Sequence, residues 1–361
     1  MKHLLPRLAA LLLCTVAPVA FAASDSNYEI LGPGGAGGIF NCDVSPLDPN
    51  FMLVCCDMTG CYRSYDGGHT WTLMNWKYLD SCVSVRAYFH PKNPNIVVWR
   101  GFITRDKAMT WQRLADRKAE PWGNITHSAC SADDQPVIFV GSVQGTWCSE
   151  DDCKTWKQII KGACGGIQIL ADNTAYAVGG NTLYRWTVRR GEPAAVPNTG
   201  IHEEIKALAI GGTQAQHTVH VVAGTKLLTS ADSGNTWKTT LTKPDLADVV
   251  MARNQEKAAY ACDKMNVYVT KDNGAVWTST FQYGKNAPHT WIQKEMYWGY
   301  YIVPGGLGCG QGNPEIVTMS SQAELYISTD FGATWTPRHT KELGPLPDGG
   351  GTRLQLSLIH I

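Results

Sequence analysis

The sequence predicts an all-β protein, a seven-bladed β-propeller whose blades each hold four short antiparallel strands. Three observations lead to this prediction. An eight-residue stretch ending in tryptophan occurs six times, its copies recur at a spacing near forty residues, and no segment shows sustained helical periodicity. A repeat of this length with short, evenly spaced strands is typical of a propeller blade.

The first copy of the repeated stretch reads SYDGGHTW, and the shared template is Ser/Thr-x-Asp-x-Gly-x-Thr-Trp. We call this stretch the clasp. Its aspartate and tryptophan pairs are Asp66 and Trp71, Asp106 and Trp111, Asp151 and Trp156, Asp232 and Trp237, Asp272 and Trp277, and Asp330 and Trp335. The aspartates lie 40, 45, 81, 40 and 58 residues apart, so the gap of 81 hides one unit without a clasp and the gap of 58 contains an insertion. These spacings predict seven units.

Each residue of the clasp suits a hairpin turn. The aspartate can accept hydrogen bonds from the backbone N–H groups that follow it, the glycine supplies a positive φ, and the Ser or Thr adds a hydroxyl bond. The tryptophan begins the outgoing strand and packs across the turn. We therefore predict that the clasp is structural, and that the unit without one centres on Thr182 to Gly191.

Other features repeat in phase with the clasp. A Pro-rich turn from Ser45 to Asn50 precedes an apolar strand, and a second such turn runs from His90 to Asn95. We expect an early strand, Tyr28 to Leu31 or Gly38 to Cys42, to complete the last blade, because an open sheet edge is a liability.

The chain ends differ from the repeats. Residues 1–22 combine Lys2 and Arg7, an apolar stretch too short to span a bilayer, and a closing Ala-Phe-Ala, which is the pattern of a signal peptide. The sequence thus predicts a secreted or periplasmic protein. The predicted propeller covers residues 26–340, and residues 341–361 are predicted to be a linker and a tail that is either non-native or truncated.

Composition and charge exclude several classes of function. Lys plus Arg and Asp plus Glu number 31 each, so no basic field predicts binding to nucleic acid or to a membrane. His90, His127 and His289 lack metal-ligand spacing, and the Gly-rich run at residues 34–38 opens no helix, so we predict no metal and no cofactor.

The chain has twelve cysteines, eleven of them after residue 22, as expected in an oxidising compartment. Cys148 and Cys153 flank a turn and are predicted to form a disulfide across it. For the other nine cysteines, disulfides and buried thiols stay open as alternatives.

The clasp resembles the Asp-box, or bacterial neuraminidase repeat, of sialidases, sortilin-type receptors and two-propeller xyloglucanases. The resemblance covers about residues 28 to 340, and it implies a fold more strongly than a function. A working sialidase is disfavoured, because after residue 22 no Arg or Lys precedes Arg63 and the chain contains no Arg-Ile-Pro motif.

A local resemblance points to the xyloglucanases. Their opening segment is similar to Gly32 to Gly38, the turn at Pro46 to Asn50, and the run from Cys56 to Arg63. This resemblance implies that Asp57 is one of two catalytic carboxylates, although Cys56, Thr59 and Cys61 depart from the family pattern. The alternative is that Asp57 only ends a strand, since Asp263 holds the same place nine residues before Asp272.

An inverting glycosidase needs two carboxyl groups, and in the xyloglucanases the second lies on a second propeller. This chain holds the repeats of one propeller. Three interpretations therefore stay open: a substitute carboxylate within the same domain, a second propeller missing from this chain, or binding without cleavage.

The expected partner is a polysaccharide or oligosaccharide. Its candidate contacts are residues that could grip a sugar chain. They are Tyr62, Arg63, Trp76, Trp122, Trp291, Trp298 and Tyr300. The first functional hypothesis is a secreted glycoside hydrolase acting on β-glucan. The alternative is a non-catalytic secreted propeller that binds glycan or protein, as sortilin-type domains bind peptides.

Overall fold

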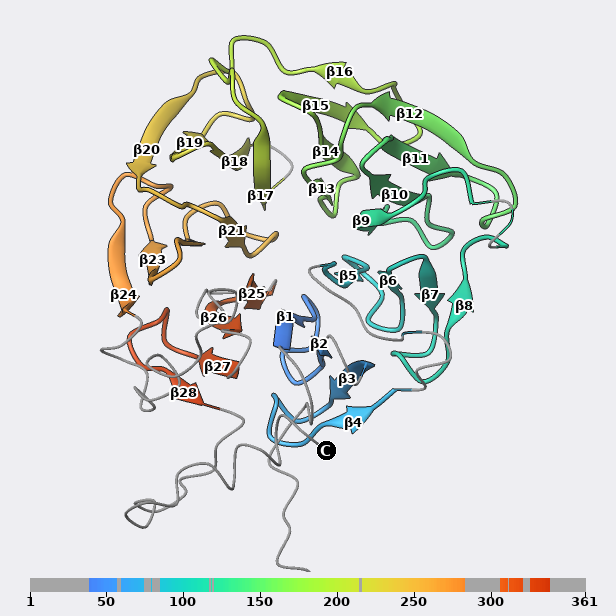
Figure 1. The fold of residues 1–361 in the computed structure, drawn as a ribbon, viewed down its shortest axis with the longest axis horizontal. Coiled ribbons are helices and arrows are strands. Elements are labelled where there is room, and N and C mark those ends of the chain that lie inside the picture. The colour runs from blue at the N-terminus through green and yellow to red at the C-terminus, as the bar shows by residue number, and fades with distance from the viewer. Residues whose placement is uncertain are drawn as a thin grey trace, which may run out of the picture. The chain divides into compact units, whose positions relative to one another are not determined.

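A computed structural model of the chain forms seven four-stranded antiparallel sheets arranged around a common centre (Figure 1). The structure describes residues 39–56, 60–74, 79, 85–116, 118, 120–213, 216–282, 306–310, 312–320 and 325–337. The predicted all-β, seven-bladed propeller is confirmed. None of the described residues belongs to a helix of the length and apolarity that crossing a membrane requires.

The blades follow one another along the chain, and each takes four consecutive strands. Blades one to three are β1 (Ile39–Val44), β2 (Met52–Cys56), β3 (Gly60–Ser64) and β4 (Thr72–Leu73); β5 (Tyr88–Phe89), β6 (Val97–Trp99), β7 (Phe102–Thr104) and β8 (Gln112–Arg113); and β9 (Ile125–Cys130), β10 (Ile138–Ser142), β11 (Gly145–Ser149) and β12 (Lys157–Lys161). Blades four and five are β13 (Ile167–Ile169), β14 (Thr174–Gly179), β15 (Thr182–Thr187) and β16 (Ala194–Ala195); and β17 (Ile205–Thr213), β18 (Gln216–Ala223), β19 (Lys226–Ser230) and β20 (Lys238–Thr242). Blades six and seven are β21 (Asp248–Met251), β22 (Ala259–Cys262), β23 (Asn266–Thr270) and β24 (Thr278–Gln282); and β25 (Gly306–Gly310), β26 (Asn313–Ser320), β27 (Leu325–Ser328) and β28 (Thr336–Pro337).

The first strand of each blade lies at the centre of the ring and the fourth lies at its rim (Figure 1). Because successive strands are antiparallel, the turn from first to second strand and the turn from third to fourth strand lie at the same edge of a blade. The third-to-fourth turn of six blades is the clasp, so we call this side of the ring the clasp face. The turn between second and third strands lies on the opposite face.

The first clasp is held by a compact set of hydrogen bonds. The Ser64 hydroxyl donates to Asp66 at 2.7 Å and accepts the Gly68 N–H at 2.9 Å. Thr70 donates its N–H and its hydroxyl to Asp66 at 2.9 and 2.6 Å, and the Trp71 indole N–H donates to the Gly68 carbonyl at 3.0 Å. The Asp66 carboxylate and the Ser64 hydroxyl thus organise the turn together.

The same carboxylate bonds recur in the other clasps, with instructive differences. In the third blade, the hydroxyl and N–H of Thr155 lower the pKa of Asp151 to about 2. In the sixth blade, Val276 replaces the threonine, so Asp272 keeps the N–H bond at 2.9 Å and lacks the hydroxyl bond. The fourth blade, predicted to lack a clasp, pairs β15 with β16 and turns through Arg189 at a φ of 63°.

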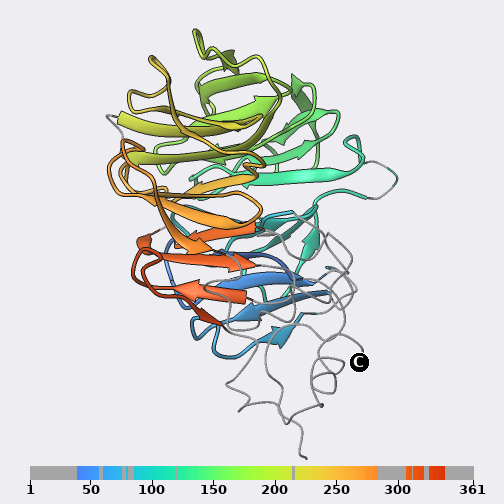
Figure 2. The ribbon, with the colours of Figure 1, turned by 60° about the vertical axis from the view of Figure 1, so that its left-hand side comes forward.

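The expectation that an early strand completes the last blade is wrong for the candidate Gly38 to Cys42, of which the structure describes residues 39–42. Residues 39–44 form β1, which pairs with β2 inside the first blade, and β25 to β28 complete the seventh. Tyr28 to Leu31 lie outside the described residues. The first and last blades instead pack side by side (Figures 1 and 2), and the Thr318 hydroxyl donates to the Cys42 carbonyl at 2.5 Å.

The predicted disulfide between Cys148 and Cys153 is also wrong, because both are free thiols. Cys153 holds the glycine position of its clasp at a φ of 67°, and the backbone there is fixed by the bond from its N–H to Ser149. Both side chains pack into the apolar cluster that contains Trp147. Cys55 is disulfide-bonded.

Candidate functional site

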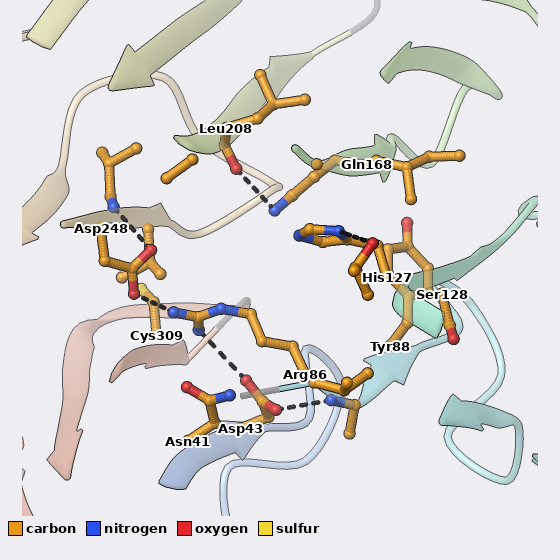
Figure 3. Close-up of a pocket in the computed structure, with 18 of the residues that line it drawn as sticks. Asn41, Asp43, Arg86, Tyr88, His127, Ser128, Gln168, Leu208, Asp248 and Cys309 are labelled. Atoms are coloured by element: carbon orange, nitrogen blue, oxygen red, sulfur yellow. Dashed lines mark hydrogen bonds and ion pairs between the residues drawn. The ribbon is translucent and has the colours of Figure 1, made fainter. Parts of the chain in front are cut away.

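The candidate site is a cavity of about 410 Å³ on the axis of the ring (Figure 3). Innermost strands of all seven blades contribute residues to its wall, from Asp43 on β1 to Cys309 on β25. Its polar lining residues are Asn41, Asp43, Arg86, Thr126, His127, Ser128, Gln168, Lys206, Asp248 and Arg253. A polar cavity at the centre of an otherwise apolar ring is the feature of the described structure best suited to hold a ligand.

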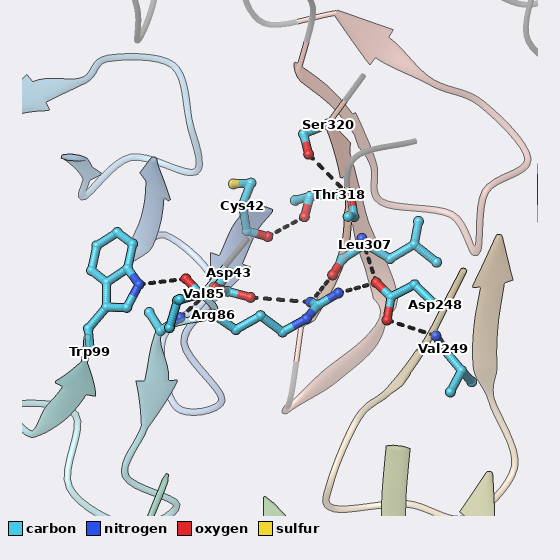
Figure 4. A network of polar contacts seen from close by, with 12 residues as sticks. Cys42, Asp43, Val85, Arg86, Trp99, Asp248, Val249, Leu307, Thr318 and Ser320 are labelled. Atoms are coloured by element: carbon cyan, nitrogen blue, oxygen red, sulfur yellow. Dashed lines mark hydrogen bonds and ion pairs between the residues drawn. The ribbon is translucent and has the colours of Figure 1, made fainter. Parts of the chain in front are cut away.

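Arg86 reaches from the second blade to three others (Figure 4). Its guanidinium donates to Asp43 on the first blade at 3.4 Å, to Asp248 on the sixth blade, and to the Leu307 carbonyl on the seventh. The Arg86 side chain lines the cavity and is 27 % exposed.

Both carboxylates have further partners. Asp43 accepts the Ala87 N–H at 2.7 Å, and Asp248 accepts the N–H groups of Val249 at 2.8 Å and Leu307 at 3.1 Å. Burial raises the pKa of Asp43 to about 6, although the charge of Arg86 opposes this rise. Burial disfavours the charged form of Arg86, but Asp248 and Asp43 more than offset it and raise the pKa of the guanidinium.

A second arginine crosses the ring nearer the clasp face. Arg253 follows β21 and is buried, and it donates to the carbonyls of Phe89 at 3.0 Å and Ile169 at 3.4 Å. Its guanidinium lies 4.2 Å from the centre of the Tyr88 ring, while the Tyr88 hydroxyl donates to the Ile169 carbonyl at 2.8 Å and accepts the Ile169 N–H at 3.0 Å. Arg253 also lines a second hollow of about 390 Å³, next to the turn at Pro46.

The wall across the cavity from Asp43 offers uncharged hydrogen-bonding groups (Figure 3). His127 Nδ1 lies 3.1 Å from the Thr126 hydroxyl, and burial, then the charge of Arg86, lowers the pKa of His127 to about 4. The imidazole is therefore neutral near pH 7. Gln168 donates to the Leu208 carbonyl at 3.2 Å, and among the described atoms the buried Ser128 hydroxyl has no hydrogen-bond partner.

Most of the predicted saccharide contacts cannot be placed at this cavity. Asp57 falls between β2 and β3 in the chain and lies outside the described residues, as do Trp76, Trp291, Trp298 and Tyr300. Asp263, which holds the place of Asp57 in the sixth blade, is buried and accepts bonds from the Met265 N–H and the Tyr268 hydroxyl at 2.7 Å each.

The three described members of the predicted contact set lie in the framework. Tyr62 is buried in the cluster that joins the first and last blades. Arg63 donates to the Ala108 carbonyl of the second blade at 2.5 Å. Trp122 is fully buried, with its ring 4.6 Å from that of Trp156, and an enclosed ring offers no face to a sugar. None of the three lines the cavity.

The cavity residues escaped the sequence analysis because they belong to no motif. A signal does exist, since Asp43, Arg86 and Asp248 each interrupt or adjoin an apolar segment that forms an innermost strand. A charge at such a position is costly to bury alone and therefore indicates a partner or a polar channel. Among the described residues, no three His, Cys, Asp or Glu side chains gather as a metal site would require.

Comparison with known proteins adds fold similarity. No protein-family model matches the chain, and no curated protein matches it. The chain is similar to the GH74 xyloglucanase of Xanthomonas campestris, at 13% identity and a TM-score of 0.66, over 86% of this chain and 55% of that one. An ancestral GH74 enzyme matches at 14% identity and a TM-score of 0.61, over 86% of this chain and 47% of that one. YCF48 bound to D1 peptide matches at 15% identity and a TM-score of 0.54, over 82% of this chain and 95% of that one.

At these low identities, the TM-scores show a shared propeller fold alone. The chain spans about half the length of the GH74 enzymes, 55% and 47%, and nearly the full length of the YCF48 chain.

Proposed function

We propose that this propeller binds a glycan in its central cavity and does not cleave it. The observation that carries the proposal is that Arg86 holds both acidic side chains of the described cavity wall, Asp43 and Asp248. An inverting glycosidase needs one carboxyl group to give up a proton and a second to activate water, about 6.5–9.5 Å apart with room between them. Two carboxylates that share one guanidinium are poorly placed for either task.

The cavity suits binding better than catalysis. Its volume of about 410 Å³ lies within the range of roughly 300–1,000 Å³ common for small-ligand sites. Gln168, His127 and Ser128 supply the amide, imidazole and hydroxyl groups that pair with sugar hydroxyls. The fold similarity to a xyloglucanase supports a glycan as the ligand class. The signal-peptide pattern of residues 1–22 supports a role outside the cytoplasm.

Calorimetry with a neutral β-glucan oligosaccharide tests this proposal, together with an assay for newly formed reducing ends. We expect saturable binding and no cleavage. Gln168→Ala should weaken binding about tenfold, because it removes a side chain that lines the cavity. Gln144→Ala, an exposed change at the turn between β10 and β11, should leave binding unchanged. Release of shorter oligosaccharides, or no binding of any oligosaccharide, overturns the proposal.

Hydrolysis with Asp57 as one carboxylate is the second candidate function. It is favoured by the similarity to GH74 enzymes and by the position of residue 57 directly after β2. The second carboxylate would then come from a further propeller. The buried, turn-bonded Asp263 supports the opposite interpretation, in which an aspartate at this place only ends a strand.

This second function has its own test. Asp57→Asn in the complete protein should abolish release of reducing ends from xyloglucan, whereas the exposed control Asp116→Asn should not. Equal rates for the parent and Asp57→Asn end the catalytic interpretation.

A further inference from the structure

The geometry points to an acidic sugar, such as a uronic acid, as the ligand of the central cavity, with Arg86 receiving its carboxylate. This inference rests on the proposed glycan-binding function and adds to it the chemical class of the ligand. It follows from the charge of the cavity wall, the free donors of Arg86 and the contact that a ligand would displace.

The described wall of the cavity carries more positive than negative charge. Arg86, Lys206 and Arg253 are cationic, whereas Asp43 and Asp248 are anionic. A net positive charge in a narrow cavity attracts anions, and the field is strengthened by the low-dielectric walls. A neutral glycan would gain nothing from this excess of charge.

Arg86 has donors to spare. A guanidinium carries five N–H groups, and the contacts to Asp43, Asp248 and the Leu307 carbonyl use three of them. Its side chain is 27 % exposed, so a ligand in the cavity can reach it. Arginine favours carboxylates because its planar fork can donate two parallel hydrogen bonds to them.

The contact between Arg86 and Asp43 is the one that a ligand would displace. At 3.4 Å it is long for a charged hydrogen bond, whereas the other Asp43 oxygen accepts the Ala87 N–H at 2.7 Å. Asp43 would thus keep its backbone partner after giving up the guanidinium. The two hydrogens of Nη1 are taken by Asp43 and the Leu307 carbonyl, so a ligand carboxylate that bonds Nη1 competes with Asp43.

This competition predicts that binding strengthens as the pH falls. Burial raises the pKa of Asp43 to about 6, so acidification removes its charge while a uronate stays ionised. The pKa of His127 is lowered to about 4, so that ring stays neutral over the same range. The nearby thiols of Cys42, Cys262 and Cys309 stay protonated, because burial raises their pKa. Arg86 stays protonated, because the charges of Asp248 and Asp43 raise the pKa of its guanidinium, so loss of the Asp43 charge makes the net charge of the wall more positive by one.

Calorimetry with cellobiouronic acid and cellobiose tests the inference, because the two disaccharides differ by one carboxylate. At about pH 5 we expect the acid to bind at least about tenfold more tightly than the neutral sugar, and at about pH 7.5 we expect a smaller ratio. Asp43→Asn should bind the acid equally well at both pH values, since its amide cannot ionise. Arg86→Gln should remove the preference for the acid, and Lys206→Ala should reduce it.

The outcomes separate this inference from the proposed function. Equal binding of both disaccharides overturns the acidic ligand and leaves the glycan site standing, whereas binding of neither disaccharide, nor of a longer neutral oligosaccharide, overturns both. An acid preference unchanged by Asp43→Asn and Arg86→Gln also overturns the inference. Tighter binding of a tripeptide with a free C-terminal carboxylate than of the uronate overturns the saccharide class. Because Arg86→Gln can fail to fold, Asp43→Asn decides the outcome alone in that case.

Discussion

Arg86 on the second blade and Asp248 on the sixth blade form an ion pair across the centre of the ring (Figure 4). With Asp43 on the first blade and the Leu307 carbonyl on the seventh, this contact joins the beginning of the ring to its end. In the part of the chain that the structure describes, each blade is built from its own four consecutive strands. The polar network therefore helps to hold the first and last blades together, as an exchange of strands between these two blades would.

Replacing Arg86 by Met should destabilise the fold by about 2–4 kcal/mol, because two enclosed carboxylates lose their counter-ion. Urea unfolding of the parent and the variant measures this loss. Arg105→Met is the control: Arg105 pairs with Asp152 where both side chains are exposed, so it should cost less than about 1 kcal/mol. Equal losses in the two variants would show that Arg86 contributes no more than a surface ion pair.

The raised pKa of Asp43 makes the free energy of unfolding depend on pH. The folded state holds this proton up to about pH 6, whereas the unfolded chain releases it near 3.8, the ordinary pKa of an aspartate. The stabilisation from the bound proton is thus fully present below about pH 4 and is lost as the pH rises through about 6, an effect of about 3 kcal/mol. Asp43→Asn should lack this component. Urea unfolding across the range compares the two proteins, and a difference that stays constant with pH contradicts the assignment.

The seven blades could be predicted from the sequence because the clasp is a local structure. The hydrogen bonds that define the clasp all lie within eight residues, among Ser64, Asp66, Thr70 and Trp71. The motif therefore predicts the turn without information from the rest of the chain. The same argument locates the fourth blade, where β15 and β16 remain although the clasp chemistry is lost.

The cavity could not be predicted in this way, because its parts meet only after the ring closes. Arg86 lies 43 residues from Asp43 and 162 residues from Asp248 in the chain. No local pattern relates them. The prediction that Trp122 contacts a saccharide was wrong for a related reason. The sequence around a tryptophan outside a clasp does not show whether the ring lies on the surface or, as here, packs against Trp156.

The sixth clasp offers a test of the clasp bonds by gain of stability. Val276→Thr should restore the hydroxyl bond to Asp272 that the other clasps have, and it replaces an exposed apolar side chain. We expect a rise in Tm of about 1–2 °C, measured by calorimetry. The reverse change, Thr236→Val in the fifth blade, should lower Tm by a similar amount. A Tm that does not move in either variant would mean that the N–H bond alone sustains the turn.

Gly68 is placed where an added side chain would be strained and crowded. Its φ is +85°, and an added Cβ at Gly68 would lie 2.8 Å from Ile327 Cδ1 on the last blade. Gly68→Ala should cost about 1–3 kcal/mol through backbone strain and crowding. Gly191→Ala is the matched control, because an added Cβ there meets nothing within 4 Å. Urea unfolding that ranks the two variants equally contradicts this explanation.

Tyr88 supports the cavity from the clasp side through its hydroxyl, which bonds both the N–H and the carbonyl of Ile169 two blades away. Tyr88→Phe keeps the ring beneath the Arg253 guanidinium but leaves the Ile169 N–H without this partner. An unsatisfied buried group costs about 1–3 kcal/mol, so the variant should unfold at lower urea by that amount. Tyr184→Phe, on the half-buried β15, should change little. If Tyr88 also shapes the ligand site, Tyr88→Phe should bind cellobiouronic acid more weakly at a pH where the variant is fully folded. Unchanged affinity would show that Tyr88 only stabilises the fold.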